Sequence, residues 1–154
     1  MILNIFITIV TFFVMEAIVC NAHKYIMHGF LCSLHEDHHK KNPSYFLEKN
    51  DYFFIIFAVP ATLFFGLGTF FSFLFYIGLG ILIYGIAYFF VHDIFIHQRV
   101  KWLRNTNNFY FRAIRRAHTM HHKHLGEEHG ECYGMLLVPF KYFKEEIQQP
   151  KSVK

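Results

Sequence analysis

The chain has 154 residues, of which 54% are hydrophobic, 20% are aromatic and only 17% are charged, against about 25% charged residues in an average soluble domain. A chain of this length is ordinarily one domain, and its apolar composition points to a protein in contact with lipid. The formal net charge of +4 at pH 7 has no pattern that argues for nucleic-acid binding, and the three cysteines form no Cys-x-x-Cys pair, which argues against a disulfide or iron–sulfur framework.

Two long apolar blocks predict membrane-spanning helices. The first, residues 2–22, contains one charged side chain, Glu16, and at about 1.5 Å per residue it is long enough to cross a hydrocarbon core of about 30 Å. The second, residues 52–91, contains no charged side chain and is long enough for two crossings. Small residues between 66 and 72 suit a turn near its middle. We therefore expect three transmembrane helices, near residues 2–22, 52–70 and 73–92.

The basic residues predict how these helices are oriented. All fifteen Lys and Arg lie in residues 23–51 and 97–154. Three crossings place both segments on the same side of the membrane, and the preference of Lys and Arg for the cytoplasm makes that side cytoplasmic. The predicted fold is an all-α, multi-pass protein of the cell membrane with a cytoplasmic, histidine-rich helical cap made of residues 23–51 and 93–144. Residues 134–143 are too short to span, so we expect them to lie at the interface or to cover a site.

Ten of the twelve histidines form two copies of one pattern. Each copy is His-x-x-x-x-His followed by His-x-x-His-His, and each follows an apolar block. The first copy consists of His23, His28, His35, His38 and His39, and the second consists of His92, His97, His118, His121 and His122. In a helix the spacing i, i+3, i+4 places the three imidazoles of each triplet on one side. With the predicted topology, all ten histidines face the same compartment.

This number of imidazoles indicates two metal ions. Neutral imidazole suits iron, copper, zinc and nickel, and a structural zinc site uses about four ligands, usually including cysteine. Ten histidines exceed what one ion holds, whereas two ions with about four to six ligands each account for them. We expect two non-haem iron ions, because paired redox-active ions share the electrons needed to cleave dioxygen and zinc has no redox chemistry.

The five-residue spacing within each copy leaves the arrangement of ligands open. In a regular helix, His23 and His28 are separated by about 140° around the axis. They therefore reach two different metal centres, or the helix is locally distorted. Four carboxylates near the histidines are candidates to orient the ligands from outside, namely Glu16, Glu36, Asp37 and Asp93.

Five sequence segments carry a resemblance that extends over most of the chain from 16 to 122. They are H-K-Y-I-M-H-G at 23–29, L-H-E-D-H-H at 34–39, E-K-N-D at 48–51, Y-F-F-V-H-D-I-F-I-H-Q-R at 88–99 and A-H-T-M-H-H at 117–122. With these segments the chain resembles the bacterial β-carotene hydroxylases, which belong to the histidine-rich superfamily of fatty acid hydroxylases and sterol desaturases. The resemblance implies a single hydroxylase domain over residues 1–154 with a di-iron centre. It also implies hydroxylation of the β-ionone rings of β-carotene at carbon 3, giving β-cryptoxanthin and zeaxanthin.

The expected reaction consumes dioxygen and needs electrons from outside. The sequence has no nucleotide-binding glycine motif, haem motif or cysteine cluster, so another protein must supply the electrons. The resemblance implies that this protein is a ferredoxin with its reductase. A basic cluster, Arg104, Arg112, Arg115 and Arg116, is a candidate docking site for this acidic donor. Retention at the cytoplasmic face or contact with anionic lipid explains the same charges.

Other functions remain compatible with parts of the sequence. Within the same superfamily, a fatty acyl or sterol hydroxylase or a carotenoid ketolase has the same histidine pattern; the short chain and E-K-N-D favour the carotenoid hydroxylase. A metal transporter is the alternative from another class. Transporters place polar ligands along a path through the membrane, whereas these predicted spans are almost devoid of polar side chains and the histidines gather at one face.

Overall fold

The computed structural model describes residues 1–39, 48–100, 106, 108–123 and 131–148, and every regular element in them is a helix. Two are π-helices, labelled η, in which the backbone hydrogen bond joins residues five apart. In chain order the elements are α1 (Ile2–Ala22), η1 (His23–Phe30), α2 (Cys32–His39), α3 (Asp51–Leu67), α4 (Ser72–Tyr88), η2 (Phe89–Ile96), α5 (Phe109–His121) and α6 (Phe140–Gln148). The prediction of an all-helical chain is confirmed for this part.

The long helices correspond to the predicted apolar blocks. α1 continues into η1, and α4 continues into η2, forming helices Ile2–Phe30 and Ser72–Ile96 of 29 and 25 residues that are long and apolar enough to cross a membrane. α3 is apolar but has only 17 residues. The fold is therefore that of a membrane-like helical protein with two candidate spans in its described residues, and the turn predicted near 66–72 separates α3 from α4.

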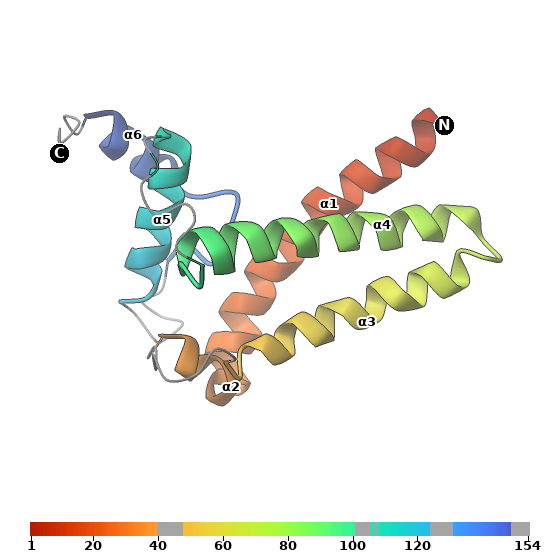
Figure 1. Ribbon diagram of the computed structural model, residues 1–154, viewed down its shortest axis with the longest axis horizontal. Coiled ribbons are helices and arrows are strands. Elements are labelled where there is room, and N and C mark those ends of the chain that lie inside the picture. Colours follow the sequence, from red (N-terminus) through yellow and green to blue (C-terminus); the bar gives the residue numbers. More distant parts are fainter. Residues whose placement is uncertain (40–47, 101–105, 107, 124–130, 149–154) are drawn as a thin grey trace.

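Two glycines of α4 allow the long helices to pack closely. In Figure 1, α3 and α4 are antiparallel and α1 crosses α4. A Cβ atom added at Gly78 would lie 3.1 Å from the carbonyl oxygen of Ala61 in α3, and one added at Gly80 would lie 2.6 Å from Cβ of Thr11 in α1. Small residues at such crossings let helix backbones approach, as in other membrane helix pairs. The core between these helices contains Met15, Val19, Ala61, Ile81 and Tyr84.

The remaining helices gather at the end of the bundle where both π-helices lie (Figure 1). α5 begins at Asn108, whose side chain accepts hydrogen bonds from the N–H groups of Tyr110 and Phe111, the usual N-cap arrangement. It buries Ala113, Ala117 and Ile114 against the rest of the cap. α2, α5, α6 and the segment before α6 thus enclose one end of the bundle, and all ten patterned histidines lie there.

Candidate metal centre

The two π-helices bring histidines five residues apart onto the same side. In η1 the N–H of Leu31 donates to the carbonyl of Ile26 at 3.0 Å, and in η2 the N–H of His97 donates to that of His92 at 2.9 Å. Because these bonds join residues five apart, the spacing of His92 and His97 matches one turn. Local distortion of the helix is therefore the arrangement that the structure adopts, and π-turns of this kind are frequent at functional sites.

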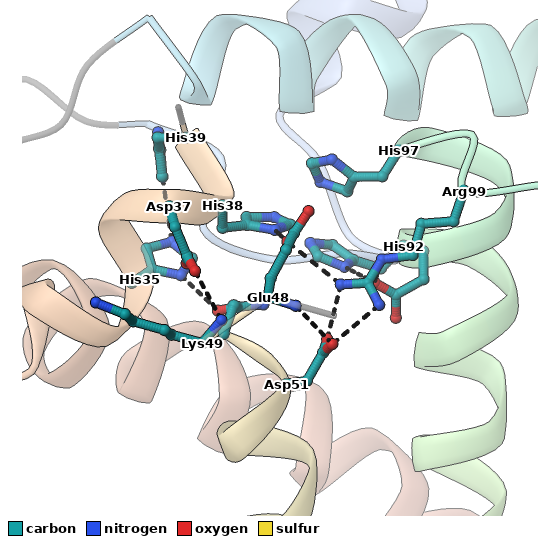
Figure 2. Close-up of polar contacts among 12 residues, drawn as sticks. His35, Asp37, His38, His39, Glu48, Lys49, Asp51, His92, His97 and Arg99 are labelled. Atoms are coloured by element: carbon teal, nitrogen blue, oxygen red, sulfur yellow. Dashed lines mark hydrogen bonds and ion pairs between the residues drawn. The ribbon is translucent and has the colours of Figure 1, made fainter. Parts of the chain in front are cut away.

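Each histidine triplet lies at the end of a short helix. His35, His38 and His39 end α2, and His118 and His121 lie in the last turn of α5 with His122 as its C-cap. Gly29, with φ −92° and ψ −122°, breaks the helical path at the end of η1, and the chain then continues into α2. Figure 2 shows His38 of α2 facing His92 and His97, with a helix of the cap above them.

The first cluster contains five imidazoles. His23, His28, His35, His39 and His121 each offer a ring nitrogen, and these atoms lie within 4.8 Å of one another. The Nε2 atom of His35 lies 3.0 Å from that of His23 and 3.1 Å from that of His39. The Nε2 atom of His121 lies 3.1 Å from those of both His23 and His28.

The second cluster contains four of the other five, and the fifth lies next to it. His38, His92, His97 and His118 offer ring nitrogens within 4.8 Å of one another. The Nε2 atom of His122 lies 2.8 Å from that of His118, so the tenth patterned histidine adjoins this cluster. With His122 included, each cluster therefore draws four histidines from one sequence repeat and one from the other, because the two middle histidines of the triplets, His38 and His121, are exchanged.

Hydrogen bonds at Nδ1 fix which nitrogen of several rings faces inward. Four Nδ1 atoms contact oxygens that only accept hydrogen bonds. Nδ1 of His23 lies 3.0 Å from the carbonyl oxygen of Tyr133, and Nδ1 of His121 lies 3.1 Å from that of Glu131. Nδ1 of His35 lies 2.7 Å from Oδ1 of Asn50, and Nδ1 of His38 lies 2.7 Å from Oε2 of Glu48. The proton must then be on Nδ1, and Nε2 presents a lone pair. This is the tautomer of a metal-binding histidine.

The charge state of the rings also fits a metal site. Burial, together with the neighbouring imidazoles, holds the pKa values of His38 and His118 well below the ordinary value and lowers that of His121 to about 2. These three rings are therefore neutral at pH 7. Within the described residues, the buried Nε2 atoms of His38 and His92 have no hydrogen-bond partner. Converging lone pairs repel one another unless a cation lies between them, and a set of neutral imidazoles suits a divalent transition metal.

Residues 48–51 orient both clusters, although the sequence suggested no physical role for them. Glu48 accepts from His38 of the second cluster, and Asn50 accepts from His35 of the first. Arg99 contacts Oδ1 of Asp51 at 2.7 Å and Oε2 of Glu48 at 3.2 Å (Figure 2). Asp51 also accepts from the N–H of Glu48 at 3.0 Å. In the sequence, the feature that could have indicated this role is the presence of two carboxylates and an amide between the first histidine triplet and the second apolar block.

The predicted outer carboxylates have different surroundings. Oδ1 of Asp93 lies 3.4 Å from Nδ1 of His92 and 3.4 Å from Nε of Arg99, so Asp93 is next to a clustered histidine. Asp37 accepts the backbone N–H of Lys49 at 2.7 Å and thereby ties α2 to residues 48–51. Glu36 lies on the exposed side of α2.

Glu16, a candidate to orient a histidine from outside, contacts a tyrosine hydroxyl and a backbone segment. The buried carboxylate accepts from the hydroxyl of Tyr84 at 2.7 Å and from the N–H groups of Met135, Leu136 and Leu137 at 2.8–3.0 Å. A Cβ atom at Gly134 would lie 3.0 Å from Oε1 of Glu16, so glycine permits this approach. Residues 131–137, which we call the strap, also carry the two carbonyls that accept from His23 and His121. Glu16 thus acts on these ligands through the strap.

The basic residues considered as a docking site are partly engaged within the chain. Arg112 Nε lies 2.8 Å from Oε2 of Glu146, and Arg116 Nε lies 2.9 Å from Oε2 of Glu145, both on α6. Arg115 donates to the carbonyl of Phe95 at 3.0 Å. Arg104 lies outside the described residues. These contacts hold α6 and η2 against α5, so three of the four arginines have a packing role.

Comparisons with known proteins identify a family and several relatives of this chain. A family model described as fatty acid hydroxylase matches residues 8–142. The beta-carotene hydroxylase of Paracoccus sp. (strain PC1) is 37% identical over 135 residues, covering 86% of this chain and 83% of the relative. That of Pantoea ananas is 38% identical, covering 88% and 78%, and the chloroplastic beta-carotene 3-hydroxylase of Gentiana lutea is 41% identical, covering 77% and 38%. No solved structure matches the chain.

Proposed function

The chain belongs to the fatty acid hydroxylase family, and from this membership we propose that it is an oxygenase that hydroxylates the β-ionone rings of β-carotene at carbon 3, giving β-cryptoxanthin and then zeaxanthin. One observation carries the proposal. Relatives named beta-carotene hydroxylase, one of them beta-carotene 3-hydroxylase, match 77–88% of the chain, and the family match from 8 to 142 includes every residue of both histidine clusters.

The ten patterned histidines are the proposed ligands of two iron ions. His23, His28, His35, His39 and His121 hold one ion, and His38, His92, His97, His118 and His122 hold the other. Bound iron supplies the redox chemistry by which dioxygen and two external electrons convert a C–H bond to C–OH, with the second oxygen atom and two protons leaving as water. Zinc fits the same imidazoles but cannot supply this chemistry.

The protein's own groups prepare the site. The acceptors at Nδ1 keep the imidazoles in one tautomer and one orientation, so the clusters need little rearrangement during turnover. Arg99 lies among Glu48, Asp51 and Asp93 and compensates their negative charge. Burial of the rings excludes bulk water and protects a strong oxidant from side reactions.

The proposed topology has three membrane crossings with the clusters on the cytoplasmic side. α3 has 17 residues, which at about 1.5 Å per residue give about 25 Å, at the short end of transmembrane helices. It runs antiparallel to α4 (Figure 1), and all Lys and Arg lie in residues 23–51 and 97–154 of the sequence, outside the apolar blocks. The positive-inside rule then supports a cytoplasmic cap, where a ferredoxin reduced by its reductase can reach it.

Pigment analysis tests this function. Bacterial cells that accumulate β-carotene are made to express the wild-type protein or His38→Ala at equal abundance, together with a working electron donor. We expect zeaxanthin with the wild type and unchanged β-carotene with the variant. Unchanged β-carotene with both proteins would reject carotenoid hydroxylation in favour of a fatty acyl or sterol substrate, and a ketone at carbon 4 would indicate a ketolase.

A further inference from the structure

An apolar cavity of about 470 Å³ lies between the long helices. Its walls come from α1, from one side of α3 and from α4 with the start of η2, and aromatic residues of α3 such as Phe53, Phe57 and Phe65 form much of it. Figure 1 shows α3 and α4 diverging from their connecting turn towards the histidine end. The volume is typical of small-ligand sites, which range over about 300–1,000 Å³.

The cavity is open at one side and reaches the metal centre at the other. Phe54, Leu82 and Phe89 line it and are 58%, 43% and 43% exposed, so the opening is on the apolar outer surface of the helices. At the inner end, the ring of Tyr88 stacks on that of His92 with centroids 4.5 Å apart. Asn50, which accepts from His35, also lines it. At its inner end the cavity is therefore lined by two side chains that each contact a clustered histidine: Tyr88 contacts His92 of the second cluster, and Asn50 contacts His35 of the first.

Polar side chains along the walls are already engaged. The hydroxyl of Tyr84 donates to Glu16, and that of Thr62 donates to the carbonyl of Ala58 at 3.0 Å. Apart from these two residues and the polar residues Asn50, Asp51, Tyr88 and Asp93, the lining residues are apolar. A ligand with a polar head group would lose hydration there without gaining partners, whereas a pure hydrocarbon loses none.

We propose that this cavity receives one β-ionone ring and the adjoining polyene of β-carotene from the bilayer; the inference rests on the proposed function. In a β-ionone ring, carbon 3 lies opposite the carbon that bears the polyene. A ring that enters end-on, with its polyene trailing between α3 and α4, therefore presents carbon 3 foremost to the inner end. The cavity thus accounts for the position of hydroxylation, and the second ring reacts only after the molecule leaves and re-enters by its other end.

Gly85 offers a direct test, because it lines the cavity and a Cβ atom added there meets nothing within 4 Å. Leucine at this position fills part of the cavity, and leucine also favours helix over glycine. Gly66 is the matched control: its added Cβ is equally free, and it is not among the lining residues. A second pair is Leu82 and Ile83, adjacent on α4 and 43% and 42% exposed, of which only Leu82 lines the cavity.

The experiment compares β-carotene turnover and bound iron for the wild type, Gly85→Leu, Gly66→Leu, Leu82→Trp and Ile83→Trp. We expect Gly85→Leu to lower hydroxylation at least about tenfold with unchanged iron content, Leu82→Trp to lower it less, and both controls to match the wild type. Wild-type turnover by Gly85→Leu overturns the proposal. If Gly85→Leu lost iron, the comparison of Leu82→Trp with Ile83→Trp tests the proposal in its place. Equal turnover by these two variants overturns the proposal. An inactive wild type would instead reject the proposed function.

Discussion

The Nε2 atoms of His23 and His121 lie 3.1 Å apart, although 98 positions separate the two residues in the chain. His23 belongs to the first histidine repeat and His121 to the second. Their contact is one half of an exchange, since His38 of the first repeat lies in the other cluster. Each cluster is therefore assembled from both repeats.

This exchange predicts how combined ligand mutations behave. His23→Ala and His121→Ala each lower the amount of bound metal, and the double variant loses little more, because both subtract from the first cluster. His121→Ala combined with His92→Ala removes ligands from both clusters and reduces bound metal further. Elemental analysis of purified proteins checks this order. Equal losses in the two double variants would contradict the assignment of His121 to the first cluster.

Residues 48–51 predict effects on metal affinity without the loss of any histidine. Glu48→Ala removes the acceptor of His38, and Asn50→Ala removes that of His35, so each should weaken metal binding by about 10- to 100-fold. Asn50→Asp retains an acceptor oxygen and should restore most of the affinity. Lys49→Ala is the control within the same motif, because Asp37 binds only the backbone N–H of Lys49. Titration with a competing chelator measures these affinities, and a Lys49→Ala effect as large as that of Asn50→Ala would refute the assignment.

The Glu16 carboxylate predicts a graded series in stability. Glu16→Ala leaves three backbone N–H groups of the strap without their acceptor, at a cost of about 1–3 kcal/mol each in the free energy of unfolding. Tyr84→Phe removes one donor of four and should cost about 1 kcal/mol, and Glu16→Gln keeps an acceptor for the strap. Thermal unfolding in detergent, with iron content measured in parallel, should rank Glu16→Ala as most damaging. An equal effect of Tyr84→Phe would show that the strap contacts contribute nothing.

The histidine pKa values predict that the metal-free protein is sensitive to acid. In the folded chain the pKa is about 3 for His35 and His122 and about 2 for His121, against about 6.5 in the unfolded chain. Between these values the unfolded state binds more protons, so stability falls as pH decreases below about 6.5 and is unaffected by these groups above it. Unfolding of metal-stripped protein at pH 7.5 and 5.5 tests this, and equal stability at both would contradict it.

Much of the helical framework followed from composition and spacing. The uncharged run from 52 to 91, with a turn near its middle, predicted a helical hairpin, which α3 and α4 form. The histidine repeat also indicated two clusters. Regular helix geometry could not decide whether His23 and His28 belong to the same cluster, because no residue type in the sequence indicates a π-turn.

Other parts of the site depend on contacts that spacing does not reveal. The exchange of His38 and His121 depends on how α2 and α5 approach each other. The role of Asn50 depends on the turn that brings residues 48–51 under α2. Glu16 was identified as an unusual charge in a span, but its partners are backbone N–H groups 119–121 positions away, for which side-chain patterns give no signal.

The exchanged histidines also bear on the order of biosynthesis. Four members of the first cluster are made within the first 39 residues, yet the fifth, His121, belongs to α5. The second cluster waits for His118 on the same helix. A nascent chain that has completed α1, α3 and α4 therefore has neither cluster complete, and both sets of imidazoles are complete only after translation of α5. Release of a truncated chain before that point leaves the imidazoles of both repeats without the partners that α5 supplies.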